Sequence, residues 1–244
     1  MAAAMARGWA RSDAGPEMLF CDLDADRAKA IAANVRGETR DSLPELRDDS
    51  DVLLLAVKPV ALGEVAAELD GRAPALLSVM AATGVAQLGE AFPGVPALRV
   101  MPNQPVEVGR GVLCYVPPDG MDDDLANELI ALLGALGTAV AVPEARIDAA
   151  MAVMSCAPAY VALFAEALAA GGERNGLEGA LSLELVAATL EGTAELLRER
   201  DPEAIRRAVA PPGGATEAGL DALSAHGFEE AIAAAVEASL ERLR

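Results

Sequence analysis

The order of apolar segments along the chain constrains the fold more than any other feature of the sequence. Up to about residue 143, short apolar runs of strand type alternate with segments of helical type, and the clearest run is DVLLLAV at 51–57. Such alternation is typical of a parallel sheet with helices on both faces. The other runs of strand type are 17–22, 75–81, 96–100, 112–116 and 139–142. The sequence therefore predicts an α/β, Rossmann-like domain over residues 1–143.

After Pro143 the runs of strand type stop, and the rest of the chain, residues 144–244, is predicted to be an all-α domain. The segment 157–170 (APAYVALFAEALAA) is apolar on nearly every face, with Glu166 as its only charge. A helix of this kind is buried on all sides, and a domain of about 100 residues has little interior for it. We therefore expect a partner subunit to cover it, in a homodimer or a higher homo-oligomer formed through the helical domain. The helices expected here are 148–154, 158–175, 180–199, 202–209, 215–223 and 228–244.

Charge, apolar run length and cysteine content indicate which partners and which cellular compartment suit the chain. A formal net charge of −19 over 244 residues disfavours nucleic acid and anionic membrane surfaces. We find no apolar run of the roughly 18 residues that a membrane span needs. Cys21, Cys114 and Cys156 are odd in number and lie in apolar surroundings, which is typical of reduced core thiols in a cytoplasmic protein.

The stretch 206–223 (RRAVAPPGGATEAGLDAL) carries the most specific local signal. Pro211 and Pro212 end one helix, and Gly213 and Gly214 allow a tight turn into the next. The open N–H groups and positive dipole end of that second helix could bind a carboxylate or phosphate, with Thr216 adding a hydroxyl. The simpler interpretation, a helix-to-helix turn without a ligand, stays open at this point.

The α/β half could bind a dinucleotide at its strand ends. Asp22 follows an apolar run, where such folds place the acid that binds the adenosine ribose. Lys58 is either a strand-end charge or a contact to cofactor phosphates.

The Gly-x-Gly-x-x-Gly turn is not in the sequence, which opens within the expected first helix. We therefore expect the natural chain to start about ten residues earlier, with an apolar first strand. No cluster has metal-ligand spacing, so no metal is expected, and His226 is interpreted as a turn residue.

A series of short motifs gives the chain a family resemblance. In order they are AVKP (56–59), RVMPN (99–103), APAY (157–160), EALA (166–169), PGGAT (212–216), GF (227–228) and EAS (237–239). Together they make the whole chain resemble the pyrroline-5-carboxylate reductases. The resemblance implies hydride transfer from NADPH or NADH to 1-pyrroline-5-carboxylate, which gives L-proline. It also implies a Rossmann domain followed by a helical domain that interlocks with that of a partner.

The resemblance assigns roles to individual residues. Thr216 is the catalytic candidate, with its hydroxyl expected toward the ring nitrogen of the substrate. No strong acid is needed at this position, because a readily protonated imine accepts hydride without one. The substrate carboxylate is expected at Gly213, Gly214, Ala215 and Thr216, with Glu199 as a further candidate. The residues implied to bind the cofactor are Asp22, Ala56, Val57, Lys58, Pro59, Met80, Ala81 and Asn103.

Three departures from the family pattern leave the substrate open. Met154-Ser155-Cys156-Ala157 replaces Ser-Gly-Ser-Gly, Pro211 replaces a serine of the anion turn, and Met80-Ala81-Ala82 replaces Ala-Ala-Gly. The alternatives are a reductase of a related cyclic imine and a non-catalytic relative that does not bind the cofactor. A hydroxyacid dehydrogenase of similar plan normally has a catalytic lysine in its helical domain. This alternative is disfavoured, because the two lysines of the chain, Lys29 and Lys58, both precede the helical half.

Overall fold

A computed structural model describes residues 1–13 and 15–243 and divides the chain into two compact units. The first unit is Met1–Cys156 with Leu243, and the second is Ala157–Arg242. The α/β unit thus extends beyond the expected boundary at residue 143, because α7 packs against β6. The division into residues 1–143 and 144–244 by role stays a prediction.

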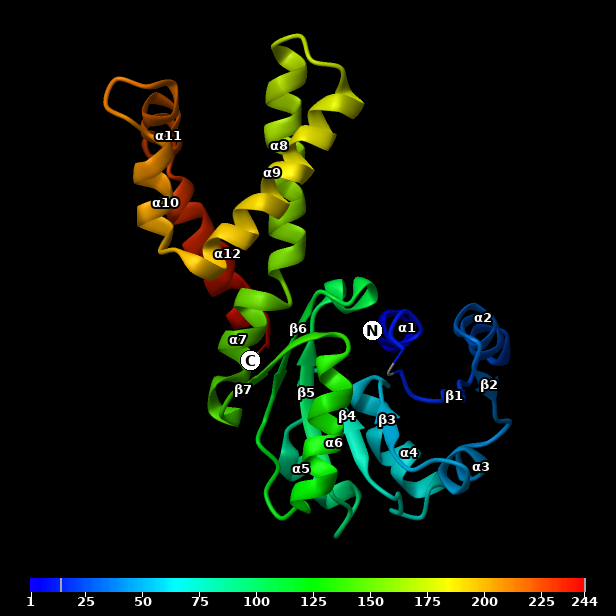
Figure 1. Cartoon of the computed structure of the whole chain (residues 1–244). Helices are drawn as coiled ribbons and strands as arrows, with labels where there is room; N and C mark the ends of the chain where they lie inside the picture. Colours follow the sequence, from blue (N-terminus) through cyan, green and yellow to red (C-terminus); the bar gives the residue numbers. More distant parts are fainter. Residues whose placement is uncertain (14, 244) are drawn as a thin grey trace. The chain divides into compact units, whose positions relative to one another are not determined.

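The first unit alternates helices and strands as the sequence predicts (Figure 1). Asp24 caps α2, since its carboxylate accepts from the N–H of Arg27 at 3.2 Å. Two short elements, β2 and α3, were not predicted. The elements are α1 (Ala2–Trp9), β1 (Leu19–Phe20), α2 (Ala25–Val35), β2 (Glu38–Thr39), α3 (Leu43–Asp48), β3 (Leu53–Leu55), η1 (Pro59–Ala61), α4 (Leu62–Glu68), β4 (Leu76–Ser78), α5 (Val85–Ala91), β5 (Ala97–Pro102), η2 (Gln104–Val108), β6 (Gly111–Tyr115), α6 (Asp123–Gly134), β7 (Gly137–Ala141), η3 (Glu144–Arg146) and α7 (Ile147–Met154).

The main sheet has the order β3-β4-β5-β6-β7. Strands β3, β4 and β5 run parallel, with Leu55 opposite Ser78 and Ser78 opposite Arg99. The sheet is parallel as predicted at all its pairings except one, because β6 runs antiparallel to β5. Strands β1 and β2 pair with each other in a separate parallel ribbon, and in the described residues no ladder joins this ribbon to β3.

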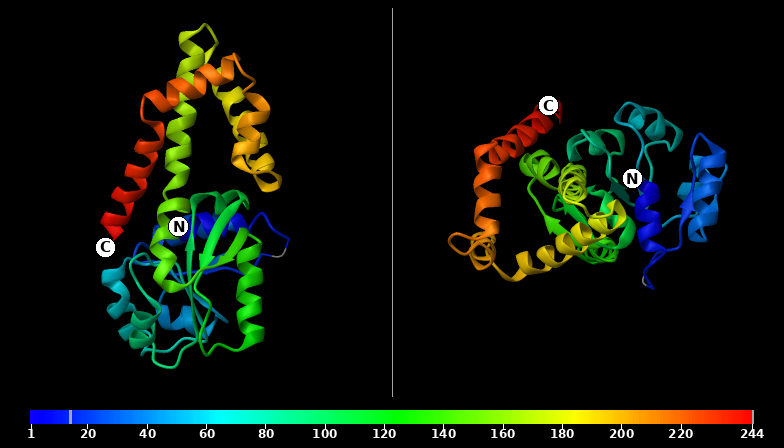
Figure 2. Two further views of the ribbon diagram at one scale, coloured as in Figure 1. Left: turned by 90° about the vertical axis from the view of Figure 1, so that its left-hand side faces the viewer. Right: turned by 90° about the horizontal axis from the view of Figure 1, so that it is seen from above.

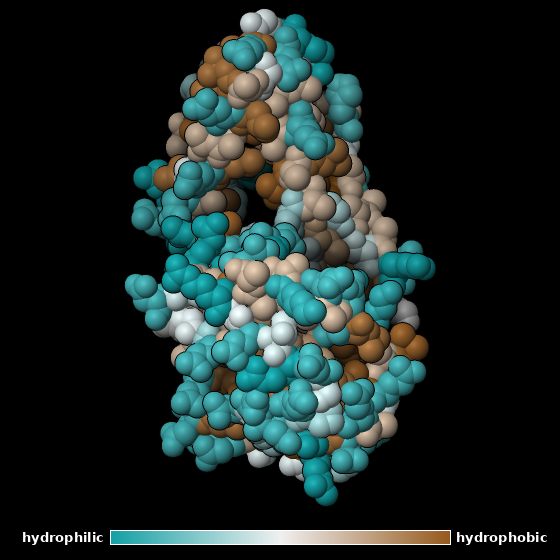
Figure 3. All heavy atoms as spheres, turned by 90° about the vertical axis from the view of Figure 1, so that its right-hand side faces the viewer, coloured by the Kyte–Doolittle hydropathy of each residue, from teal (hydrophilic) through white to brown (hydrophobic). Residues whose placement is uncertain are grey.

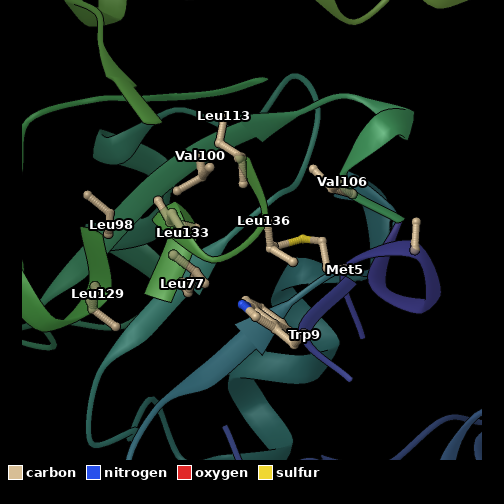
Figure 4. Packing of buried hydrophobic residues seen from close by; sticks show 11 residues of the cluster. Met5, Trp9, Leu77, Leu98, Val100, Val106, Leu113, Leu129, Leu133 and Leu136 are labelled. Carbon is tan, nitrogen blue, oxygen red and sulfur yellow. The ribbon is translucent and has the colours of Figure 1, made fainter. Parts of the chain in front are cut away.

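The largest core of this unit lies between the sheet, α1 and α6 (Figure 4). Leu77, Leu98 and Leu133 are among its fully buried members, so the core is aliphatic, as the low aromatic content requires. Trp9 is buried beside them and its indole N–H donates to the carbonyl of Leu132 at 2.9 Å. Gly8 lets α1 approach closely, since a Cβ there would lie 2.1 Å from the carbonyl oxygen of Val106.

Only one of the three cysteines is a core residue. Cys114 is buried, whereas Cys21 and Cys156 are half-buried, so the expectation of three core thiols was wrong. Burial raises the pKa of the Cys114 thiol, and burial together with nearby carboxylates, first Glu68, raises that of Cys21. A raised thiol pKa keeps both groups protonated and unreactive at neutral pH.

The second unit is entirely helical, as predicted. Its helices splay apart in the views of Figure 2, and of the described residues 157–243 only Ala169, Ser182 and Val186 are buried. Helix α12 was predicted to reach Arg244, which lies outside the described residues. The helices are α8 (Ala157–Arg174), α9 (Gly179–Glu199), α10 (Pro202–Val209), α11 (Ala215–Ala225) and α12 (Phe228–Leu243).

The apolar helix α8 is not buried by its own chain. Val161, Leu163 and Leu168 are exposed, with 65% of Leu163 accessible, and hydrophobic surface lies open on this unit in Figure 3. By length and mean hydropathy, Glu144–Arg174 reaches the range of a membrane span, so the expectation that no stretch does was wrong. An exposed apolar surface of this extent marks an interaction site.

Three of the sequence motifs meet inside this unit. The hydroxyl of Tyr160, from the APAY motif, hydrogen-bonds Ser239 of the EAS motif at 2.6 Å. Phe228, from the GF motif, packs on Phe164 of α8 with ring centroids 6.4 Å apart. These motif residues therefore hold α8 and α12 together.

Candidate functional site

The cofactor-side residues follow the carboxyl ends of three adjacent parallel strands. Ala56 to Pro59 come after β3, Met80 and Ala81 after β4, and Asn103 after β5. Parallel strands end at one edge of a sheet, so the structure brings these residues together. Ala56, Val57, Lys58, Pro59 and Ala81 are exposed there, whereas Met80 and Asn103 are buried.

The loop between β4 and α5 is fixed by its own side chains. Ser78 Oγ accepts from the N–H of Met80 at 3.4 Å, and the buried Thr83 hydroxyl donates to the carbonyl of Ala81 at 3.3 Å. Between them Ala82 has φ 51°, the left-handed conformation that favours glycine. This is the position where the family pattern has glycine, so the chain retains the backbone turn at a cost in strain.

Asn103 is engaged by the protein at both polar atoms of its side chain. The carbonyl oxygen accepts from the N–H of Val112 at 2.8 Å, and the amide nitrogen donates to the carbonyl of Met154 at 3.1 Å. Ser155 adds a 3.3 Å bond to the carbonyl of Pro102. One N–H of the carboxamide is left for a ligand, and the other bonds fix the strand end against the end of α7.

Asp22 lies two residues beyond β1, as an adenosine-ribose acid would. Its carboxylate accepts from the N–H of Asp24 at 2.9 Å and lies 3.6 Å from the guanidinium of Arg27. Lys58 stands at the start of η1 with an exposed side chain and no ion pair in the described part of the chain. An acid and a cation at strand ends suit the ribose and phosphate ends of a dinucleotide.

The turn before α11 differs in detail from the predicted anion site. The N–H of Gly213 donates to the carboxylate of Glu217 at 2.7 Å, and the N–H of Gly214 donates to the carbonyl of Pro211 at 2.9 Å. Gly213 has φ 74° and needs to be glycine. Gly214 has an ordinary φ of −84°, but a Cβ there would lie 2.8 Å from the oxygen of Pro211. Both glycines thus build the turn.

The open donors belong to the first turn of α11. No side chain caps this helix within the described residues, so the N–H groups of Ala215 and Thr216 remain directed at the helix end. Thr216 is exposed. Glu199 is an exposed residue at the end of α9, and no hydrogen bond or ion pair of the described residues joins it to the turn.

Sequence reasoning missed three charged residues next to these sites. Glu217 occupies the N–H of Gly213, and the buried Arg99 pairs with Glu144, which also binds the N–H of Val85. Glu217 could have been noticed from its place in the first turn of a helix, where an acid is favourable. Arg99 lies in the RVMPN motif, but its pairing with Glu144 carried no signal, because the two residues are 45 positions apart in the chain.

His226 lies at the end of α11, as the turn interpretation predicts. Its Nδ1 is 2.8 Å from the carbonyl oxygen of Ala222. Among the described residues no group of three His, Cys, Asp or Glu side chains is placed to hold a metal ion. Residues 56–59 and 81–82 are exposed and follow the ends of β3 and β4.

Comparisons with known proteins give the same picture along the chain. A family model described as "Pyrroline-5-carboxylate reductase dimerisation" matches residues 144–244, and one described as "NADP oxidoreductase coenzyme F420-dependent" matches residues 1–82. A pyrroline-5-carboxylate reductase of Synechocystis is 40% identical over 202 residues, which cover 81% of this chain and 76% of that protein.

Two solved structures resemble the whole chain. The 1-pyrroline-5-carboxylate reductase of Streptococcus pyogenes has a TM-score of 0.89 at 26% identity, covering 100% of this chain and 94% of that one. The pyrroline carboxylate reductase of Plasmodium falciparum, with NADP bound, has a TM-score of 0.85 at 27% identity, covering 98% and 92%.

Proposed function

This chain belongs to the pyrroline-5-carboxylate reductase family, and on that premise we propose how its residues carry out the reaction. It is an NAD(P)H-dependent oxidoreductase that reduces 1-pyrroline-5-carboxylate to L-proline. The loops 56–59 and 80–81 hold the nicotinamide end of the cofactor, and Asp22 binds its adenosine ribose. The turn at 213–216 holds the substrate.

The observation that carries this proposal is the convergence of strand ends. Three segments that the family resemblance assigns to the cofactor, which lie far apart in the sequence, follow β3, β4 and β5 at one edge of the parallel sheet. Open α/β sheets bind ligands at that edge. Because the side chains of 56–59 and of 81 are exposed there, a flat ring can lie against their backbone.

The residues of this chain supply placement and charge. NAD(P)H supplies the hydride. The open N–H groups of Ala215 and Thr216, at the positive end of α11, hold the substrate carboxylate. The Thr216 hydroxyl faces the ring nitrogen of the substrate. This nitrogen takes up a proton before the imine carbon accepts the hydride, so no side chain has to act as a strong acid.

The protein assembles as a homo-oligomer, since its helical part matches a dimerisation domain. Our finer proposal is that α8 and its neighbours form the interface of a homodimer, which would cover exposed residues such as Leu163 and Phe164. The proposal includes a cytoplasmic location and the division into a cofactor domain at 1–143 and a substrate and dimerisation domain at 144–244.

The test is turnover by the purified protein. We expect it to oxidise NAD(P)H when 1-pyrroline-5-carboxylate is added, with L-proline as the product by chromatography. Parallel assays with a six-membered cyclic imino acid examine the related-imine alternative. Binding of NAD(P)H without turnover of either imine would contradict the proposal and favour the non-catalytic alternative.

A further inference from the structure

An ion pair between the buried Arg99 and the half-exposed Glu144 anchors the loop that we assign to the nicotinamide. The side chain of Arg99, in β5, is 5% exposed, and its Nη1 donates to Glu144 Oε1 at 2.5 Å. The same oxygen accepts from the N–H of Val85 at 3.0 Å, where the loop 80–84 passes into α5. One carboxylate oxygen thus joins β5, η3 and the end of the loop.

The local sequence supplies one contact at this helix end, since Gln87 Oε1 accepts from the N–H of Gly84 at 2.8 Å. Gly84 itself has no side chain to bind the N–H of Val85, so the acceptor for that group comes from Glu144, 59 positions further along the chain. A Cβ on Gly84 would lie 3.0 Å from Glu144 Oε1, which shows how closely the loop backbone approaches the carboxylate. A serine or aspartate at the cap would stabilise the helix by itself.

The arrangement is costly for stability alone. Arg99 Nε is buried without a hydrogen-bond partner among the described residues, and burying an unpaired donor is unfavourable. Glu144 is 38% exposed, and an ion pair that is partly open to solvent contributes little net stability. The pair therefore has a benefit other than stability, and the element that it fixes is the cofactor loop.

We propose that Arg99 and Glu144 are positioning residues for cofactor binding. The guanidinium fixes the Glu144 carboxylate, the carboxylate holds the N–H of Val85, and the loop 80–84 is thereby set against the nicotinamide. This inference rests on the proposed function, which places the cofactor at Met80 and Ala81. Neither residue touches the reacting atoms.

The test compares Glu144→Ala and Glu144→Gln with a matched control, Glu107→Ala. Glu107 pairs with Arg7 at 2.7 Å in the same unit and is 34% exposed, close to the 38% of Glu144, but its partners are in α1 and η2. Each variant is examined for KM of NAD(P)H, KM of the imine, kcat and melting temperature. Hydrogen–deuterium exchange of residues 79–88 is measured without cofactor.

We expect Glu144→Ala to raise the KM for NAD(P)H roughly tenfold, the scale of one lost hydrogen bond, while the KM for the imine changes by less than about twofold. Exchange at 80–85 becomes faster. Glu144→Gln keeps an acceptor for Val85, so KM and loop exchange should stay close to the wild-type values. Glu107→Ala changes neither quantity.

Unchanged loop exchange in Glu144→Ala would overturn the inference, as would an equal effect in Glu107→Ala or a loss of melting temperature with unchanged KM for NAD(P)H. The exchange measurement needs neither cofactor nor turnover. If the wild-type protein reduces no imine, the proposed function fails, and the exchange result still decides whether Glu144 positions the loop.

Discussion

Ala82 offers a direct test of how the cofactor loop is built. Its φ of 51° lies in the left-handed region, where a Cβ costs roughly 1–2 kcal/mol. Replacing Ala82 with glycine removes that strain. Glycine also makes the unfolded chain more flexible, which offsets about 0.4–1 kcal/mol of the stabilisation gained by removing the strain. The free energy of unfolding should therefore rise by about 0.5–1 kcal/mol in Ala82→Gly.

The neighbouring Ala81 provides the matched control. It is also exposed, but it is not among the residues with positive φ, so glycine there gains nothing and still increases unfolded-state freedom. Ala81→Gly should lower the free energy of unfolding by about 0.4–1 kcal/mol. The two variants make the same chemical change one residue apart and should move stability in opposite directions.

The single tryptophan makes the measurement specific. Trp9 is buried in the core of the α/β unit, so its fluorescence in urea reports the unfolding of that unit. We expect Ala82→Gly to raise the urea midpoint with an unchanged slope, and the melting temperature by about 1–4 °C for a unit of this size. An unchanged or lower midpoint in Ala82→Gly, or an equal gain in Ala81→Gly, would refute the reasoning from strain.

Three further predictions concern the binding residues. Thr216→Ala should cost about 1–3 kcal/mol in kcat/KM for the imine with an unchanged melting temperature, and unaltered kinetics would remove Thr216 from the site. Glu217→Gln removes a negative charge beside the proposed position of the substrate carboxylate. Because this removes roughly 1 kcal/mol of repulsion, the KM for the imine should fall by a factor of about five. An equal or higher KM would show that Glu217 does not face the substrate. Asp22 should accept from a ribose 2′-hydroxyl and repel a 2′-phosphate, so kcat/KM should favour NADH, and Asp22→Ser should shift the ratio toward NADPH; a wild-type preference for NADPH would contradict its placement.

Gly214→Val is a poor probe of the substrate turn. If the turn binds a carboxylate, a valine there would be expected to fill the space that the carboxylate needs. The structure places the new Cβ against Pro211, so this substitution disrupts the turn itself and gives no information about a ligand. Thr216→Ala, which removes an exposed hydroxyl, is the cleaner variant.

The sequence by itself determined what depends on local pattern. Apolar runs alternating with helical segments gave the α/β unit and its strands, since hydrophobic period and length decide the type of an element. Helix caps such as Asp24 and breaks such as Pro211 followed from single residues. The strand-end positions of Ala56, Met80 and Asn103 followed from the resemblance combined with this pattern.

Only the tertiary structure decided what depends on residues that are distant in sequence. The antiparallel pairing of β5 with β6 is set by how the chain returns to the sheet, which no local pattern encodes. The bonds of Tyr160 to Ser239 and of Arg99 to Glu144 join residues 79 and 45 positions apart, and a single sequence gives no signal for such pairs. The same holds for the use of the Gly213 N–H by Glu217, which depends on the rotamer that a side chain adopts in the folded turn. Local physics fixed the elements, and long-range packing fixed which polar groups remain free to bind a ligand.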